Sequence, residues 1–426
     1  MRRRTITATL ATAAFAVALT GCASGGTAEA DGDLSGDLLY AIWDENQAPA
    51  LEQMAADFTA QHPEVSITVE VTPFAQYWTK LQTQATAKTL PDVFWMNGPN
   101  AKVYAPGGVL EPITGLIESG DVDPANYPDS LNELYTLDGV QYGVPKDFDT
   151  IGVWYNADIL ERAGVAIPTA DWTWADFQEA AQTVSEQLSG EGVYGAVAEL
   201  ASGGQQGYYN TIFQAGGSVI SDDMTTSGYD DPKSIEGLQF WADLIASGAS
   251  PTIQQLSDTT PNQWFTSGKA AMYWAGSWMV SEIAASEVAD AVGTVQMPAG
   301  ERSATVIHGV ANVVAADGEN TEAALAFAAY LGSEEAALTL AEFGAAIPAF
   351  NGTQDAWVAS APTFGLQMFL DAAADYAVPD PESYNTGAWR EVERELLPQA
   401  FSGERPVAEV AQELADRMNE LLAEEQ

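Results

Sequence analysis

The sequence predicts an α/β fold in two lobes, and three observations lead to this prediction. The chain has 426 residues, whereas a single hydrophobic core stops growing at roughly 250 to 300 residues. Residues 38–71 carry strand, helix and strand patterns in the order of a βαβ unit, which favours a parallel sheet with a right-handed crossover. Residues 142–160 combine prolines and glycines with a following strand pattern. We therefore expect the chain to pass from one lobe into the other within this stretch.

The N-terminus has the pattern of a secreted lipoprotein. Three arginines at positions 2–4 precede an almost uncharged apolar run that ends at Leu19 and is too short for an ordinary membrane span. The run closes with Leu-Thr-Gly and Cys22, the only cysteine, and this ending resembles the lipobox, in which the cysteine is lipidated. We expect residues 1–21 to be the signal peptide and residues 22–37, rich in Gly, Ser, Ala and acids, to be a flexible tether.

Charge restricts the partners that the chain can bind. Its 60 acidic and 15 basic residues give a formal net charge of -45 at pH 7. This charge repels nucleic acids and anionic headgroups, so we expect no nucleic-acid partner and explain the acidity by solubility or a salty habitat. Phosphate and carboxylate ligands usually recruit arginine forks, and few basic residues lie in the polar segments near the expected ligand. The composition favours a neutral ligand.

The first lobe is expected to begin with alternating strands and helices of period 2 or 3.6. The expected elements are a strand over 38–42, a helix over 49–58, a strand over 65–71, a helix over 74–87 and a strand over 92–96. Trp43 and Asp44 follow the first strand, while Trp95 and Asn97 end the third. Ligands in open α/β sheets bind beyond the carboxyl ends of strands, so these four side chains are expected at one crevice. Trp95 by itself belongs more often to a core.

The stretch between the lobes carries charged groups. A proline at position 145 biases the residues before it toward extended structure, and residues 151–155 alternate as a strand. Lys146, Asp147 and Asp149 are therefore expected just before this strand, where the lobes meet. We expect the hinge and the ligand site to be neighbours.

The rest of the chain alternates between the same two patterns. Thr173 and Ser333 are candidate N-caps of helices, and we expect the C-terminal helical region to be interrupted at Pro398 and Pro406. The other expected helices cover residues 235–245, 260–265, 321–331 and the region from 389 onward, and the expected strands cover 194–197, 268–274, 293–298 and 305–314.

The sequence lacks the motifs of common enzymes. It contains no GxSxG, no phosphate-binding glycine loop and no cluster with metal-ligand spacing, and His62 and His308 are its only histidines. A histidine-based triad or a zinc site is therefore not expected. Pairs of carboxylates carry little information among 60 acidic residues. We expect a binding protein without metal or cofactor, and a surface glycosidase or lyase is the alternative.

Aromatic side chains beside glycines and amides point to a sugar ligand. Flat rings match the apolar faces of sugars, while carboxylates and amides hydrogen-bond to the hydroxyls at their edges. Roughly half of these rings are expected to fill the cores instead. The aromatic candidates are Trp43, Trp95, Tyr208, Tyr209, Trp264, Trp274, Trp278 and Trp357.

Five segments in the correct order resemble the family 1 extracellular solute-binding proteins of ABC importers, a group that includes maltose-binding proteins. The segments are Leu90 to Trp95 (LPDVFW), Tyr142 to Asn156, Gly268 to Met272 with the following Gly276-Ser277-Trp278, His308-Gly309, and Phe343 to Pro348. The likeness covers residues 38 to about 422 and follows a lipoprotein leader.

The resemblance implies a two-lobe, type II periplasmic-binding-protein-like α/β fold. Each lobe is then a mixed, mostly parallel sheet flanked by helices, and the ligand cleft lies between the lobes. The implied first lobe comprises residues 38–147 and 311–348, and the implied second lobe comprises residues 148–310 and 349–426.

The resemblance also implies a function. It describes an extracellular lipoprotein, anchored through Cys22 as a monomer on the outer face of the bacterial cytoplasmic membrane. This protein captures a neutral mono- or oligosaccharide by lobe closure and delivers it to the transmembrane subunits of an ABC permease. A sensor that presents its ligand to a receptor is a further alternative.

Some site residues follow from alignment with the maltose-type proteins. Positions that line sugar clefts in those proteins match Trp95, Asp149, Tyr208, Trp278 and Trp357, of which the aspartate is the best candidate for a sugar hydroxyl. A Gly-Pro pair after the third strand departs from a charged pair in those proteins. The complete set of expected ligand contacts is Trp43, Asp44, Trp95, Asn97, Lys146, Asp147, Asp149, Tyr208, Trp274, Trp278, His308 and Trp357.

Overall fold

Residues 34–425 are described by a computed structural model. The helices and strands are, in chain order, β1 (Gly36–Ile42), α1 (Ala48–Gln61), β2 (Val65–Val71), α2 (Phe74–Ala87), β3 (Val93–Asn97), α3 (Gly98–Tyr104), α4 (Thr114–Ser119), α5 (Asp129–Leu134), β4 (Thr136–Leu137), β5 (Val140–Gln141), β6 (Gly143–Asn156), α6 (Ala157–Ala163), α7 (Trp174–Gln187), β7 (Tyr194–Ala198), α8 (Tyr208–Gln214), α9 (Pro232–Ala246), α10 (Ile253–Asp258), α11 (Pro261–Thr266), β8 (Ala270–Gly276), the 3₁₀ turn η3 (Ser277–Met279), α12 (Val280–Ala284), β9 (Val292–Val295), β10 (Thr305–Val314), α13 (Thr321–Leu331), α14 (Glu334–Glu342), β11 (Ile347–Pro348), α15 (Gln354–Ser360), α16 (Gln367–Asp375), β12 (Ala377–Pro379), α17 (Thr386–Phe401) and α18 (Val407–Ala423).

The N-terminal predictions fall mostly outside this range. The expected signal peptide and Cys22 lie outside the described residues, as does most of the expected tether. β1 begins at Gly36 and pairs from its first residue with β2, so the predicted end of the tether at residue 37 is two residues too late. None of the helices within residues 34–425 is long and apolar enough to cross a membrane.

Ten of the described strands join in one mixed sheet, whose main path has the order β2-β1-β3-β10-β6-β8-β7, and β4 and β5 form a separate hairpin. β1 pairs in parallel with β2 and with β3, and β7 pairs in parallel with β8. This confirms the βαβ unit expected at the start of the first lobe. The middle of the sheet is antiparallel: β10 pairs antiparallel with both β3 and β6, and β6 pairs antiparallel with β8.

β6 belongs to both halves of the sheet. Its residues 143–150 pair with β10, and residues 151–155 pair with β8. The prediction that Lys146, Asp147 and Asp149 precede a strand is therefore wrong, since all three lie within β6. A β-bulge between Val310 and Ala311 leaves Lys146 without a direct partner in the register, and bulges are where strands tolerate a nearby proline.

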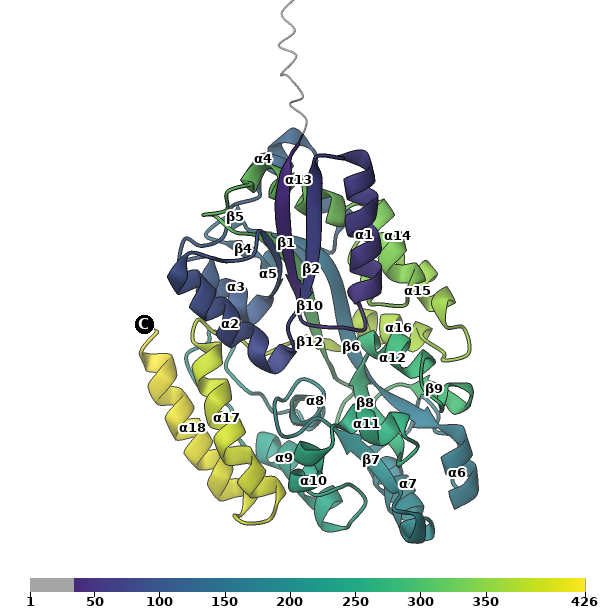
Figure 1. The fold of residues 1–426 in the computed structure, drawn as a ribbon. Helices are drawn as coiled ribbons and strands as arrows, with labels where there is room; N and C mark the ends of the chain where they lie inside the picture. The colour runs from purple at the N-terminus through teal and green to yellow at the C-terminus, as the bar shows by residue number, and fades with distance from the viewer. Residues whose placement is uncertain (1–33, 426) are drawn as a thin grey trace, which may run out of the picture. The chain divides into compact units, whose positions relative to one another are not determined.

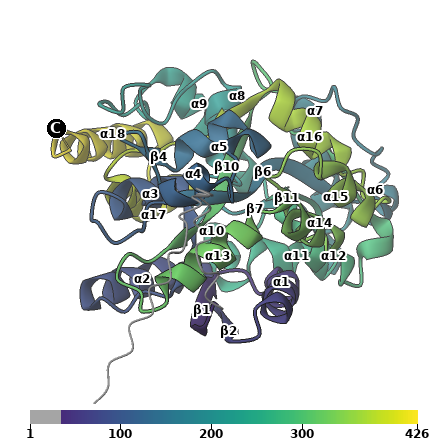
Figure 2. The same ribbon diagram turned by 90° about the horizontal axis from the view of Figure 1, so that it is seen from above.

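Apolar side chains form two cores that this strand connects. One core is built from residues 38–144 and 310–349. The other is built almost entirely from residues 151–306 and 357–422. Figure 1 shows α1, α2 and α13 around β1 and β2 in the first lobe, and α7, α9 and α10 near β7 in the second. Figure 2, turned by 90°, shows α17 and α18 on the opposite side of the described chain from α6 and α16.

The two predicted N-caps are confirmed, whereas one of the two prolines predicted to interrupt the C-terminal helices does not do so. Thr173 caps α7 in a reciprocal capping box with Asp176, and Ser333 caps α14. Pro398, predicted to interrupt the C-terminal helical region, lies inside α17. It sits in the last turn of that helix, where one lost backbone hydrogen bond is tolerated. Pro406 directly precedes α18.

Candidate ligand-binding site

The carboxyl ends of β1, β2 and β3 place polar groups beside the second lobe. Asp44 follows β1 and accepts hydrogen bonds from the backbone nitrogen of Asn46, at 2.9 Å, and from Gln47 Nε2, at 3.1 Å. Burial raises the pKa of Asp44, and these hydrogen bonds offset part of the effect. Asn46 Nδ2 lies 3.3 Å from Oε2 of Glu282, which is on α12 in the second lobe. This edge of the first lobe thus faces the second.

Lys146 and Asp147 form a buried ion pair at the boundary between the cores. Their exposed fractions are 5% and 4%, and the two charged groups contact each other directly. The bulge in β6 turns these consecutive side chains toward each other, although neighbours in a regular strand point to opposite faces. Lys146 Nζ also donates to Gln47 Oε1 at 2.9 Å and lies 4.2 Å from the ring centre of Trp95. These contacts compensate the burial of the ammonium group.

Asp149 and His308 lie opposite each other on β6 and β10. His308 Nδ1 is 3.5 Å from Asp149 Oδ2, and Gln205 Nε2 donates to Asp149 Oδ1 at 2.9 Å. Burial raises the pKa of Asp149 to about 6, although the contact with His308 opposes this effect. Burial lowers the pKa of His308, but Asp149 and the nearby Asp380 outweigh it, so the pKa of His308 lies above its ordinary value.

A second charged pair adjoins this one. Arg390 donates to Asp380 Oδ2 at 2.7 Å and to the carbonyl oxygen of Pro381 at 3.0 Å. The other polar atoms of the pair, Asp380 Oδ1 and Arg390 Nε, are buried without a hydrogen-bond partner among the described residues. Buried polar atoms are nearly always satisfied, so a water molecule or another polar group is expected beside these two atoms.

The two lobes also touch beside α3. Lys102, on α3, forms an ion pair with Glu382 Oε1 at 2.8 Å, and its Nζ is 3.7 Å from Met224 Sδ. Glu382 lies between β12 and α17, which pack with the second lobe. Gly98 begins α3, and a Cβ atom there would come 2.9 Å from Glu382 Oε2. The missing side chain lets the two segments approach.

Comparison with known proteins places the chain in a family. The model of the family described as bacterial extracellular solute-binding protein matches residues 43–338. The chain belongs to this family. It is 24% identical to the diacetylchitobiose binding protein DasA of Streptomyces coelicolor over 458 aligned positions that cover 100% of both chains. It is also 24% identical to a putative binding protein of Brucella abortus over 282 residues, which are 65% of this chain and 66% of that one.

Solved structures agree with the family assignment. An ABC substrate-binding protein from Listeria monocytogenes, in complex with cycloalternan, superposes with a TM-score of 0.84 at 25% identity, covering 91% of this chain and 99% of the other. This similarity establishes the two-lobe, type II fold for the solute-binding protein. The fold class expected from the sequence is therefore confirmed.

Two of the tryptophans predicted to contact the ligand belong to the interior of the solute-binding protein. Trp274 is 0% exposed, and its ring packs against Phe177 and Trp241. Every residue of β8 is buried, and the ring of Trp274 is covered by side chains of α7 and α9, which pack on the face of the sheet to which it points. Trp357 is also 0% exposed and packs against Phe369. Neither ring surface is open to a ligand in this structure.

Three other predicted contacts hold the site's framework together. Trp95 is fully buried, and its Nε1 donates to the hydroxyl of Tyr40 at 2.7 Å. The Asn97 side chain caps α3 by accepting from the backbone nitrogen of Asn100 at 3.2 Å. Tyr208, 2% exposed, donates to Glu393 Oε2 at 3.2 Å. These side chains lie beneath the boundary and position the groups above them.

The remaining predicted residues keep accessible surface at or beside the boundary. They are Trp43, Asp44 and His308, with Trp278 directly after β8. Trp278 depends on Gly276, since a Cβ atom at that position would lie 1.9 Å from Trp278 Cζ3. Sequence reasoning missed Gln47, Gln205, Glu282 and Asp380. Gln205 had a signal, because its segment is rich in glycine and glutamine.

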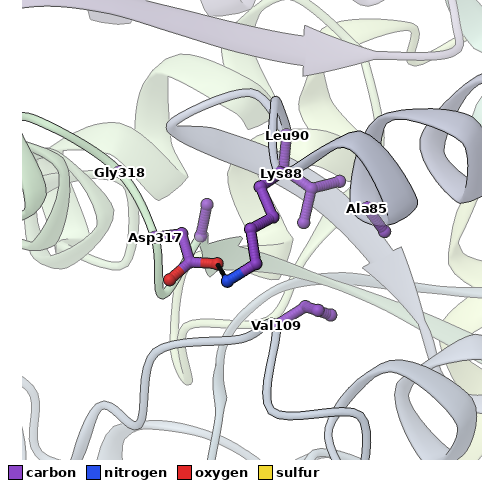
Figure 3. Close-up of a pocket in the computed structure, with 7 residues that line it drawn as sticks. Ala85, Lys88, Leu90, Val109, Asp317 and Gly318 are labelled. Atoms are coloured by element: carbon purple, nitrogen blue, oxygen red, sulfur yellow. Dashed lines mark ion pairs between the residues drawn. The ribbon is translucent and has the colours of Figure 1, made fainter.

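A small pocket lies in the first lobe, near the start of β3 and the end of β10 (Figure 3). The ion pair between Lys88 and Asp317, at 3.0 Å, crosses it. Its volume of about 20 Å³ has room for about one water molecule. Leu90 and Gly318 lie near the start of β3 and after the end of β10, away from the carboxyl edge that faces the second lobe. This pocket is therefore not a candidate for the ligand of a solute-binding protein.

The Asp149 and His308 pair predicts a pH dependence of stability. Both folded-state pKa values lie above the ordinary ones, so the pair binds more protons in the folded than in the unfolded state. Its stabilising contribution is complete below about pH 4 and is lost as the pH rises through about 6 and then through the raised pKa of His308. We compare the wild type with an Asp149→Asn, His308→Gln double variant by urea unfolding. Between pH 5 and pH 8 the free energy of unfolding of the wild type should fall by about 1–3 kcal/mol more than that of the variant.

The comparison with the double variant cancels the effect of the other titratable groups, which are the same in both proteins. The charges facing this pair are Asp147, Asp380 and Arg390, and all three remain in the variant. The overall acidity of the chain acts on both proteins alike. Equal pH slopes for the two proteins would contradict the prediction.

Proposed function

We propose that this solute-binding protein captures a neutral sugar between its lobes and delivers it to the transmembrane subunits of an ABC permease. The observation that carries the proposal is the meeting of polar groups from both lobes around β6, the strand that the lobes share. A ligand that touches both lobes repays the free energy of closing them. The named relatives and structural neighbours include a diacetylchitobiose binding protein and a complex with cycloalternan.

The charges at the boundary support a neutral ligand. Lys146 is paired with Asp147, Lys102 with Glu382 and Arg390 with Asp380. An anion would have to compete with these carboxylates for each cation. Carboxylates such as Asp44 and Asp149 can instead accept hydrogen bonds from hydroxyl groups. This arrangement suits a polyol better than a phosphate or a carboxylate.

We assign the ligand contacts to those members of the predicted set that lie at the boundary between the lobes. In this proposal Asp44, Asp149 and His308 hydrogen-bond to sugar hydroxyls, while Trp43 and Trp278 supply aromatic surface. Lys146 and Asp147 hold the floor of the site, and Gln205 and Asp380 add polar contacts from the second lobe. Trp274 and Trp357 are left out because their rings are covered.

The remaining parts of the proposal concern the organisation of the whole chain. The first lobe comprises residues 36–147, from the start of β1, and 311–348, and the second comprises residues 148–310 and 349–426. The protein acts as a monomer, anchored to the outer face of the cytoplasmic membrane through a lipid on Cys22. It binds and releases its ligand without chemistry. A glycosidase or lyase would instead release product steadily from an oligosaccharide.

A thermal-shift screen tests the function directly. A ligand that binds only the folded state raises the melting temperature, and at 100 times its dissociation constant it stabilises by about 2.7 kcal/mol. We expect a rise with at least one neutral mono- or oligosaccharide and none with inorganic phosphate. Hits confined to peptides, polyamines or metal ions would overturn the sugar assignment.

A further inference from the structure

A continuous group of aromatic rings leads from the floor of the site to the surface of the first lobe. Trp43 stands at its centre, with its ring 4.9 Å from that of Trp95 and 5.2 Å from that of Tyr77. On its other side it contacts Trp78 and Phe74, each at 5.7 Å. Exposure increases outward along this group, from 0% at Trp95 to 53% at Phe74.

The backbone fixes the outer rings beside the proposed ligand contacts. The backbone nitrogen of Thr72 donates to the carbonyl oxygen of Ile42 at 2.9 Å, so the start of α2 is tied to the end of β1. Phe74 is the first residue of α2, and Trp78 lies one turn later on the same face. Both rings therefore adjoin Trp43 and Asp44, at the edge where ligands of open α/β sheets bind.

The surface around the outer rings is unusual for this chain. Although 60 of its 426 residues are acidic, residues 71–91 contain no aspartate or glutamate. Lys80, within this stretch, is paired with Glu70, which leaves α2 with mostly amide and hydroxyl groups beside the rings. The exposed ring of Phe74 packs against Trp78 and Trp43. The three rings thus form a contiguous apolar surface, and surfaces of this kind mark contact sites. Its neutral surroundings match an uncharged ligand.

We propose that Phe74 and Trp78 form an outer subsite that stacks on a sugar unit beyond the unit held at Trp43 and Asp44. This inference rests on the proposed function and narrows it, since the ligand is then an oligosaccharide and not a monosaccharide. The apolar face of the outer unit covers the exposed ring of Phe74, and the amide and hydroxyl groups of α2 lie near its edge. The ring planes of Trp43 and Phe74 are inclined by 73°, so the two rings present differently oriented faces to neighbouring units of one ligand.

The test measures how affinity depends on ligand length. Calorimetric titrations use malto-, galacto-, arabino- and chito-oligosaccharides of one to five units, with the wild type and with Phe74→Ala. In the series that binds, we expect the wild-type affinity to rise with length and Phe74→Ala to weaken binding of the longer members about 3- to 10-fold, the loss of one aromatic stacking contact. The shortest member that binds should keep its affinity. Phe74→Tyr, which retains the ring, should bind like the wild type.

The controls separate this inference from the proposed function. Ile167→Ala removes an equally exposed apolar side chain, 52% accessible, from the second lobe, and should change no affinity. If Phe74→Ala weakens the affinity for oligosaccharides of every length equally, or for none of them, the outer subsite is contradicted while sugar binding by the protein stands. The same follows if Phe74→Ala changes only self-association in light scattering, which would assign the rings to a second copy of the chain. A wild type that binds no member of any series overturns both the function and the subsite.

Discussion

Replacing Asp149 with alanine is expected to weaken saccharide binding about 10- to 100-fold. Hydrogen bonds to a charged group contribute about 1.5–3 kcal/mol, and in the proposed site this carboxylate accepts from a ligand hydroxyl in the region where the lobes meet. The loss also leaves Gln205 Nε2, which donates to Asp149 at 2.9 Å, without its acceptor. Isothermal titration calorimetry with the sugar found by the thermal-shift screen measures the change.

A matched variant distinguishes lost contacts from lost structure. Asp258 is an exposed aspartate whose Oδ1 accepts only from Gln254, one turn earlier in α10. Asp258→Ala should leave the affinity unchanged. The melting temperature without ligand should stay unchanged in Asp258→Ala. Asp149→Ala leaves His308 without its carboxylate partner, so circular dichroism must show that this variant is folded before its titration is interpreted. An Asp149→Ala protein with wild-type affinity would remove Asp149 from the site.

Replacing Glu393 with alanine is expected to lower the free energy of unfolding by about 3–5 kcal/mol. This carboxylate is 1% exposed and accepts from the hydroxyls of Tyr208, Tyr209 and Tyr229. Its removal leaves three buried hydroxyls without an acceptor in the second lobe. Burial raises the pKa of Glu393, and Arg390 and the tyrosines offset part of this effect. Urea unfolding followed by circular dichroism measures the loss.

Two variants of α17 check the cause. Glu393→Gln keeps one acceptor oxygen in nearly the same volume and should lose clearly less stability than the alanine variant. Glu391, two residues earlier, pairs with Arg394 on the surface with 72% of its side chain exposed. Glu391→Ala should therefore change the free energy of unfolding by less than about 0.5 kcal/mol. A loss of less than about 0.5 kcal/mol in Glu393→Ala would contradict the prediction, because the three tyrosine hydroxyls would then not depend on this carboxylate as their acceptor.

Local pattern was enough to predict much of the first lobe. The helix over 74–87 and the strand over 65–71 have the predicted bounds, because their periodic apolar positions and the flanking prolines lie in the same short segments. The position of Asp44 at a carboxyl edge followed from the βαβ order alone.

Tertiary packing decided what local pattern could not. A tryptophan within a strand looks the same in sequence whether it is covered or open, and Trp274 is covered because Phe177 of α7 and Trp241 of α9 pack against its ring. Asp380 comes near His308 because β12 pairs with β10, about 70 residues earlier in the chain. Glu393 meets its three tyrosines from more than 160 positions away. The sequence pattern of one segment cannot predict contacts between residues so far apart in the chain.

β10 determines the order in which the protein can take shape during synthesis. It lies between β3 and β6 in the sheet, yet it is made from residues 305–314, after nearly all of the second lobe's strands. A nascent chain that has reached residue 300 already contains β1, β2 and β3 but has no strand to join them to β6. The first lobe therefore forms late despite its early sequence, since its pairings are non-local and slow to find.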